Sequence, residues 1–189
     1  MNKIHLLIIQ IIITIISTSL HESAHAFTAW ILGDYTCKDK IFAFFDNINI
    51  PNIIISRFAS MNNINIPLKL GSVSYYPNNL YNNELGKILI AYAGPIMNLL
   101  IALITIYINK FVNNRNVNYI LYLIIEQNIM FFAFNILPIP NLDGYELVNY
   151  FFPNLNIYIN IVYLITIAIS MNYYSNYINI VRNFVYKLI

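Results

Sequence analysis

The sequence predicts an all-α polytopic membrane protein, because its residues are unusually apolar and because the apolar residues gather in long runs. Of the 189 residues, 59% are hydrophobic and 10% are charged, and the mean hydropathy is +0.61. Soluble domains carry about 25% charged residues. A helix needs about 20 apolar residues to cross the hydrocarbon core of a bilayer. We therefore expect residues 1–189 to form a single intramembrane domain, as an integral, multi-pass protein of a bacterial-type cytoplasmic membrane or an organelle membrane.

Four apolar runs are candidates for transmembrane helices. They cover residues 4–32, 87–108, 117–139 and, in a shorter run, 157–171. The first run is too long for a signal peptide and no small-residue cleavage pattern follows it, so we expect a retained span. Residues 172–189 mix Tyr, Asn and cationic residues with aliphatic ones, which is typical of an interfacial amphipathic helix or of a tail.

The long segment of residues 33–86, between the first and second runs, has a different pattern. Residues 68–75 alternate at a period of two, which predicts a strand. We expect a small β-hairpin or re-entrant element here, dipping into the membrane beside the functional site, with an ordinary surface loop as the alternative. Irregular backbone at that depth is tolerated where protein buries it or where it lines a wet cavity.

Charge and cysteine content exclude some functions. The net charge of +2 is small and the basic residues are scattered, so we expect no nucleic-acid partner. The single cysteine, Cys37, excludes an internal disulfide framework and a cysteine-based zinc site. Any metal ion must therefore be held by His and carboxylate side chains.

The most informative motif is His21-Glu22-Ser23-Ala24-His25, inside the first apolar run. Residues four apart share one face of a helix, so His21 and His25 can point at one metal ion with Glu22 beside it. A metal ion in such a site lowers the pKa of water to about 7, and a neighbouring carboxylate can take the proton. Short matches of this kind also arise by chance. Ionisable groups within a span are nevertheless costly, and they indicate a functional site.

A catalytic zinc ion usually has three protein ligands, and Asp143 is the best candidate for the third. It follows Pro138 and Pro140 at the broken end of the third run and precedes Gly144. The prolines stop the helix and the Asp-Gly pair permits a tight turn, which can aim the carboxylate sideways. An ordinary turn is the alternative for this segment alone.

Glu126 is a further ionisable residue within the third apolar run. An unpaired carboxylate does not face lipid, so we expect it to face a water-filled cavity or a polar neighbour, or to lie at the membrane interface.

Three motifs together resemble those of the site-2 protease family of intramembrane zinc metalloproteases. The first is the His21 to His25 motif, and the second runs from Asn135 to Gly144 and matches Asn-x-x-Pro-x-Pro-x-Leu-Asp-Gly. The third, Ala93-Gly94-Pro95-Ile96-Met97-Asn98, is similar to Ala-Gly-Pro-x-x-Asn. Leu32-Gly33-Asp34-Tyr35-Thr36 also resembles a motif of the short members that lack a PDZ domain.

The resemblance implies a role for each matching residue. His21, His25 and Asp143 would hold one Zn²⁺ per chain, and Glu22 would be the general base and acid. Asn135 would orient substrate or stabilise an oxyanion, and Asn98 would give polar support. Gly94 and Pro95 would let their helix pack closely or bend.

The chain also departs from the family pattern. Asn141 stands where Pro is common, Tyr145 stands where a second Gly is frequent, and the loop after Thr36 lacks the usual Gly-Arg-x-Thr-Leu-Asn-Pro sequence. None of these positions is a proposed ligand, so the departures bear on the loop and on substrate preference more than on catalysis.

The expected function is hydrolysis of peptide bonds in or near transmembrane segments of membrane-protein substrates, in regulated intramembrane proteolysis. The lipid bilayer is an expected partner, and self-association into a homo-oligomer is left open. An edge strand at residues 68–75 could capture an unwound substrate by strand addition. The alternatives are a catalytically silent membrane scaffold of the same fold, which binds transmembrane segments without cutting them, and a transporter or channel subunit that uses the polar cluster as an ion site.

Overall fold

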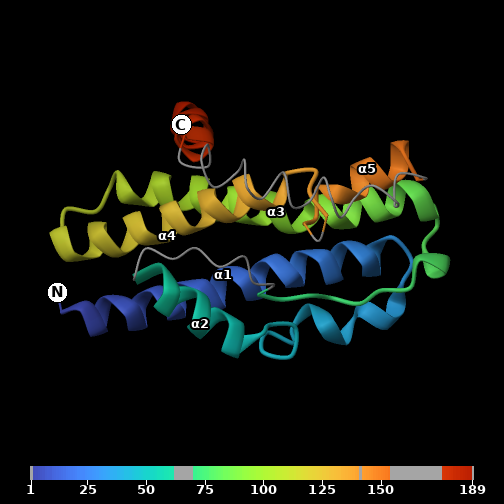
Figure 1. Cartoon of the computed structure of the whole chain (residues 1–189), viewed down its shortest axis with the longest axis horizontal. Helices are drawn as coiled ribbons and strands as arrows, with labels where there is room; N and C mark the ends of the chain where they lie inside the picture. Colours follow the sequence, from blue (N-terminus) through green and yellow to red (C-terminus); the bar gives the residue numbers. More distant parts are fainter. Residues whose placement is uncertain (1, 62–69, 141, 154–175, 189) are drawn as a thin grey trace.

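A computed structural model describes residues 2–61, 70–140, 142–153 and 176–188. Three long helices lie side by side in it: α1 (Lys3–Ile31), α3 (Asn83–Asn109) and α4 (Arg115–Asn135) (Figure 1). Each is long and apolar enough to cross a membrane, and they match the first three predicted spans. The fourth predicted span, residues 157–171, lies outside the described residues.

Helix α1 has its apolar side chains on the outside and its polar side chains inside the bundle, the reverse of a helix in a soluble protein. The exposed side of α1 carries isoleucines four residues apart, and its buried side is polar. The exposed residues include Ile4, Ile8, Ile12 and Ile16, and the buried ones include Thr14, Ser17, Thr18, Ser19, His21, Glu22 and His25. The exposed surface therefore suits lipid, while the polar groups, which are costly in hydrocarbon, face one another inside the bundle.

An asparagine residue caps the N-terminus of each of the three long helices. Asn82 accepts a hydrogen bond from the N–H of Leu85 at 3.1 Å, and Asn2 and Asn114 cap α1 and α4 in the same way. Such caps satisfy N–H groups that have no partner within the helix. Helix α1 ends before Gly33, whose φ of 117° favours glycine.

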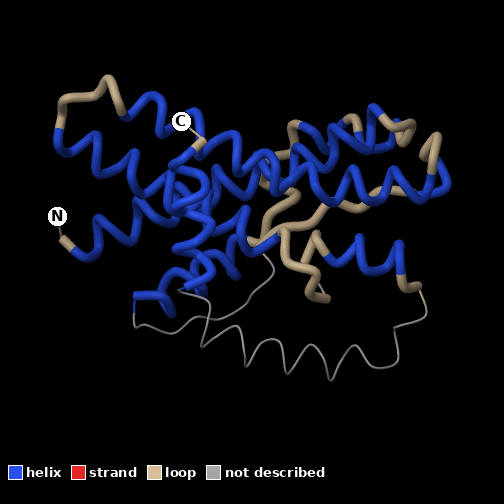
Figure 2. The backbone as a smooth tube through the Cα atoms, turned by 90° about the horizontal axis from the view of Figure 1, so that it is seen from above, coloured by secondary structure: helices blue, strands red, loops and turns tan. Residues whose placement is uncertain are grey.

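The predicted β-hairpin is not seen in the described part of residues 33–86, which forms helices and loops but no strand (Figure 2), and the alternative of a re-entrant element stays a prediction. This segment instead forms α2 (Ile50–Met61) and the short 3₁₀ turns η1 (Tyr35–Cys37), η2 (Asp39–Ile41) and η3 (Pro77–Asn79).

Residues 70–76, which we call the strap, run beside α1, and a single antiparallel bridge joins Gly71 to Ile48. Val73 and Tyr75 pack against a cluster that includes Ala26 and Ala29 of α1. A helix has already used its backbone groups internally, so it cannot pair with the strap as a second strand would.

A helix forms at residues 176–187, within the range predicted for an amphipathic helix, and its interfacial position stays a prediction. Val185 packs into a buried cluster formed with α3 and α4, made of Ala102, Ile106, Ile125 and Ile129. The guanidinium of Arg182 donates its Nε to Oε1 of Glu126 at 2.9 Å. Arg182 is therefore the polar neighbour expected for Glu126.

Candidate metal centre

The three predicted ligands, His21, His25 and Asp143, come together although they lie up to 122 positions apart in the sequence; we call them the ligand triad. Nε2 of His21 lies 3.0 Å from Nε2 of His25 and 3.0 Å from Oδ2 of Asp143. The distance from Nε2 of His25 to the same Oδ2 is 3.5 Å. Both imidazoles are buried and the carboxylate is half-buried.

The position of Asp143 is set by the way the chain turns back after α4. The N–H of Gly144 donates to the carbonyl of Asn135 at 2.8 Å, which closes the turn over the end of the helix. A Cβ atom at Gly144 would collide with the backbone carbonyl of Ile136, so only glycine fits. The sequence then continues into the short helix α5 (Tyr145–Phe151). Asn135 thus enters the site through its backbone, and its predicted role toward substrate stays a prediction.

Each imidazole is held through its other ring nitrogen. Nδ1 of His25 lies 2.6 Å from the carbonyl oxygen of Ile90, and Nδ1 of His21 lies 2.6 Å from Oδ1 of Asn98. Both partners are acceptors, so both Nδ1 atoms carry the proton. In the neutral imidazoles, the Nε2 lone pairs of His21 and His25 then face Asp143.

Three lone-pair atoms at these separations repel one another unless a metal ion or a proton lies among them. A zinc ion with Zn–N bonds of about 2.05 Å and tetrahedral angles would hold its ligand atoms about 3.3 Å apart. The observed separations of 3.0, 3.0 and 3.5 Å lie on either side of that value. The donor set and its spacing thus fit a zinc ion, as predicted for His21, His25 and Asp143.

Helix α3 lies close to the Nε2 atoms of the ligand triad at Gly94. A Cβ atom there would lie 2.5 Å from Nε2 of His21 and closer still to Nε2 of His25. The next residue, Pro95, lies inside the helix and is buried. The predicted close packing at Gly94 is therefore present, and it leaves room for the two imidazoles.

Glu22 lies directly after His21 and is buried under the strap. A Cβ atom at Gly71 would lie 2.5 Å from Oε1 of Glu22 and 2.8 Å from the carbonyl oxygen of Asn47. The strap is held there because the N–H of Ser72 donates to that same carbonyl at 2.9 Å. The carboxylate predicted as general base thus contacts the backbone of an extended segment.

The far end of the strap is tied to the loop after α1 by Asp34. This buried carboxylate accepts hydrogen bonds from the backbone N–H of Tyr76 at 2.7 Å and from the side-chain amide of Asn79 at 2.9 Å. It also accepts the hydroxyl hydrogen of Thr36 at 2.7 Å. Burial alone would raise the pKa of Asp34, but these hydrogen bonds outweigh it and lower the pKa to about 2.

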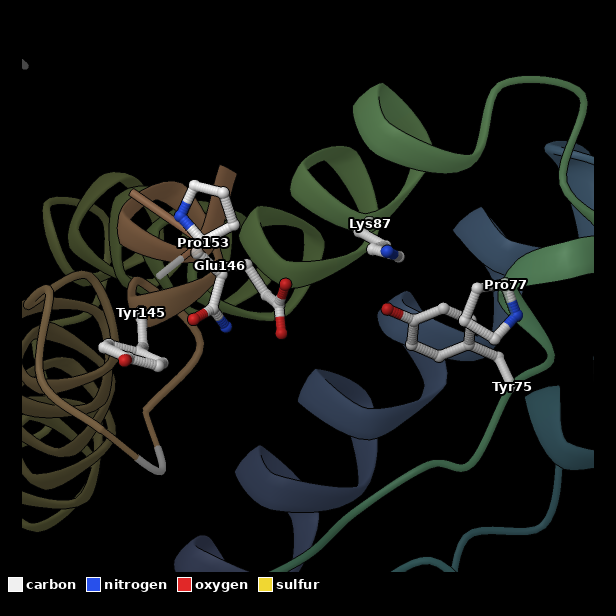
Figure 3. A pocket seen from close by; sticks show the side chains of 7 residues that line it. Tyr75, Pro77, Lys87, Tyr145, Glu146 and Pro153 are labelled. Carbon is white, nitrogen blue, oxygen red and sulfur yellow. The ribbon is translucent and has the colours of Figure 1, made fainter. Parts of the chain in front are cut away.

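A cleft of about 460 Å³ lies between the end of the strap and the residues that follow the Asp143-Gly144 turn (Figure 3). On one side lie Tyr145 and Glu146, the first residues after the Asp143-Gly144 turn. On the other lie Tyr75 and Pro77, at the end of the strap, with Lys87 of α3 between them in the view. Burial and the charge of Glu146 raise the pKa of Tyr75 to about 12, so its hydroxyl keeps its proton. The cleft is thus lined by groups that can donate and accept hydrogen bonds.

Asn128 is a residue of the site that the sequence analysis missed. It is fully buried on α4, its Oδ1 accepts from Nδ2 of Asn98 at 2.9 Å, and its own Nδ2 donates to Oγ of Ser17 and to the carbonyl of Ile124. The signal available in the sequence was a polar residue within an apolar run, the same one that drew attention to Glu126.

The fold and the geometry define a class: a helical chain with apolar outer faces that encloses a His-His-Asp centre and a neighbouring carboxylate, as a membrane metallohydrolase requires.

Curated relatives agree with this class. The chain is similar to the "Putative zinc metalloprotease Rip2" of Mycobacterium tuberculosis, with 26% identity over 144 residues, which cover 69% of this chain and 52% of that protein. It is also similar to the "Putative zinc metalloprotease YwhC" of Bacillus subtilis, with 25% identity over 154 residues, which cover 73% of this chain and 66% of that protein. These relatives confirm the resemblance to the site-2 protease family and support a peptidase-like activity.

The chain spans about half the length of Rip2. No family model matches it, and no solved structure matches it.

Proposed function

We propose that this protein is an intramembrane zinc metalloprotease that hydrolyses peptide bonds in or near the transmembrane segments of membrane proteins. The observation that carries the proposal is the convergence of the Nε2 atoms of His21 and His25 on the carboxylate of Asp143, inside a bundle whose outer surface is apolar. Zinc bound there would polarise a carbonyl group and make water more acidic.

Glu22 is the residue that moves protons in this proposal. It follows a ligand on the same helix and is buried, so it can take a proton from the attacking water and give it to the departing amine. Asn135, at the end of α4, orients the substrate or its developing oxyanion, and Asn98 supports His21.

The strap and the cleft suit an extended substrate. A peptide bond in a helix is already hydrogen-bonded internally, so a substrate must unwind before it can be cut. The strap passes Glu22 at Gly71 and reaches the cleft at Tyr75, so a substrate that added to it as a strand would run past the general base.

Zinc content and cleavage, measured together, test the proposal. Full-length wild type, Glu22→Gln and Asp143→Asn are purified in detergent, analysed for zinc, and incubated with a single-span membrane-protein reporter. We expect one zinc per chain in wild type and in Glu22→Gln, less in Asp143→Asn, and cleavage by wild type alone.

Three other outcomes contradict the proposal. Folded wild type without zinc would overturn the metal site, and an ion-dependent transport activity without cleavage would favour a transporter. Zinc-loaded wild type that cuts no membrane-protein reporter would favour the silent scaffold.

A further inference from the structure

We propose that Asn128 is a positioning residue that fixes which nitrogen of His21 faces the metal, acting through the side chain of Asn98. This inference rests on the proposed zinc site. It concerns residues on three different helices: His21 on α1, Asn98 on α3 and Asn128 on α4.

One group in this chain of hydrogen bonds cannot change its role. The backbone carbonyl of Ile124 only accepts, and it lies 2.8 Å from Nδ2 of Asn128. If the Asn128 amide were turned over, its oxygen would face the carbonyl oxygen, and two acceptors would repel one another. The orientation of the Asn128 amide is therefore fixed within its own helix.

A fixed Asn128 fixes Asn98. With the Nδ2 hydrogens of Asn128 directed at Ile124 and Ser17, its Oδ1 is left to accept from Nδ2 of Asn98 at 2.9 Å. Asn98 is fully buried, so its amide cannot turn toward water instead. The Oδ1 atom of Asn98 must then face His21.

A fixed Asn98 in turn fixes His21. Its Oδ1 lies 2.6 Å from Nδ1 of His21, so Nδ1 carries the proton and the lone pair of Nε2 points into the ligand triad. An asparagine on its own could present either edge to the imidazole, and the wrong edge would favour the proton on Nε2. His25 needs no such relay, because its Nδ1 faces the backbone carbonyl of Ile90 directly.

The first test is zinc affinity, measured by chelator competition on the full chain in detergent. Asn128→Leu frees the Asn98 amide to turn, and we expect an affinity loss of about 10-fold, at the lower end of the effects seen for outer-shell partners. Gln127→Leu is the matched control. It makes the same kind of change one residue away, where Gln127 contacts Arg57 of α2, and we expect zinc affinity to be kept.

Asn128→Ser guards against a folding defect in the leucine variant. A serine can bond to the carbonyl four residues before it, so the helix keeps a satisfied polar group, but the side chain is too short to hold Asn98. We expect the same affinity loss, with the circular dichroism spectrum unchanged.

A rescue experiment separates orientation from simple loss of contacts. A carboxylate has no donor edge, so Asn98→Asp presents an acceptor to His21 whichever way it turns. We expect Asn98→Asp/Asn128→Leu to bind zinc more tightly than Asn128→Leu alone. A purely structural role predicts the opposite, because the double variant has lost more native hydrogen bonds than the single one.

The outcomes distinguish the two proposals. Unchanged zinc affinity in Asn128→Leu and Asn128→Ser, beside a zinc-loaded wild type, or a double variant weaker than Asn128→Leu, would overturn the relay alone. Wild type that binds no zinc would overturn both the relay and the proposed function.

Discussion

Gly94 of α3 lies against the imidazole of His21 so closely that a Cβ atom at position 94 would stand 2.5 Å from its Nε2. The imidazole cannot retreat, because Nδ1 is held by Asn98 on its other side. Residue 94 therefore determines whether there is space for a metal ion between α1 and α3.

Replacing Gly94 by alanine should remove metal binding while leaving the fold in place. The new methyl group would occupy space beside the Nε2 atoms of His21 and His25, and displacing an imidazole by even a few tenths of an ångström distorts a tetrahedral site. We expect zinc affinity to fall at least about 10-fold, a loss comparable with removing an outer-shell partner. Chelator competition on detergent-purified protein measures it.

Gly86→Ala is the control on the same helix. Its added methyl would meet the Cδ1 atom of Leu80 at 2.9 Å, the end of a flexible side chain that can move aside. Equal zinc affinity in the two variants would contradict the role given to Gly94.

Replacing Gly71 by alanine should slow cleavage without releasing zinc. The methyl group would press on Oε1 of Glu22 and on the carbonyl of Asn47, so either the carboxylate or the strap must shift. A misplacement of about 1 Å can cost about 100-fold in rate. We expect kcat for a membrane-protein reporter to fall by up to that factor with one zinc per chain retained, as measured by single-turnover cleavage and elemental analysis.

Ser72→Ala is the comparison for the Gly71 variant, because Ser72 is the next residue and its side chain is exposed. Its backbone N–H still donates to Asn47 after the change. If the cleavage rate falls equally in both variants, the strap is sensitive to any substitution. That result would contradict the proposal that Gly71 acts through its contact with Glu22.

The lowered pKa of Asp34 should make the folded protein less stable as pH falls through a defined range. Its pKa is about 2 in the folded protein and 3.8 in a free side chain, so the unfolded chain binds the proton first as pH falls. The stabilisation is complete above about pH 5 and is lost as pH falls from there toward 2. Asp34→Asn should unfold at a temperature lower by on the order of 5 °C at pH 7, with the gap to wild type closing toward pH 2.

Thermal unfolding in detergent at several pH values tests the Asp34 prediction. Asp39→Asn is the control, because Asp39 lies five residues on and is exposed. A gap between wild type and Asp34→Asn that stays constant from pH 7 to pH 2 would mean that the ionised carboxylate is not what holds the strap.

Breaking the ion pair between Glu126 and Arg182 should loosen the helix of residues 176–187. Arg182→Met would leave the carboxylate of Glu126, which is 20% exposed, without its cation. Removing one partner of a fully buried ion pair costs about 3–5 kcal/mol of stability, and the partly exposed Glu126 should cost less. We expect Glu126→Gln/Arg182→Met to be more stable than Arg182→Met alone, with a coupling of about 1–2 kcal/mol. Unfolding of the four proteins in one detergent gives this coupling, and a value near zero would mean that the other contacts of the helix hold it, namely the packing of Val181 and Val185 and the hydrogen bond from Tyr177 to Ala133.

The sequence was sufficient to predict the long helices and the ligand triad. Apolar runs of spanning length predict α1, α3 and α4. The i, i+4 spacing places His21 and His25 on one face of a helix whatever the position of that helix in the fold. Asp143 could be predicted because two prolines and a glycine restrict the chain locally, and local restrictions are visible in sequence.

The errors fall where distant segments decide the outcome. Alternation predicted a hairpin near the strap, but the strap forms one isolated bridge, at Gly71, and packs along a helix, which a local pattern cannot reveal. The link from Asp34 to Asn79 joins residues 45 positions apart, and the bond from Asn128 to Ser17 joins residues 111 positions apart. Neither pairing leaves a periodic signal.

Three consecutive residues of α4, Glu126, Gln127 and Asn128, contact the helix of residues 176–187, α2 and α3 respectively. Successive side chains on a helix point about 100° apart, so these contacts surround the axis of α4. A turn of α4 about its own axis would break all three at once, and a turn in either direction meets the same resistance. These three contacts therefore oppose rotation of α4 about its own axis. Tilting or shifting α4 together with its neighbouring helices would leave the contacts intact.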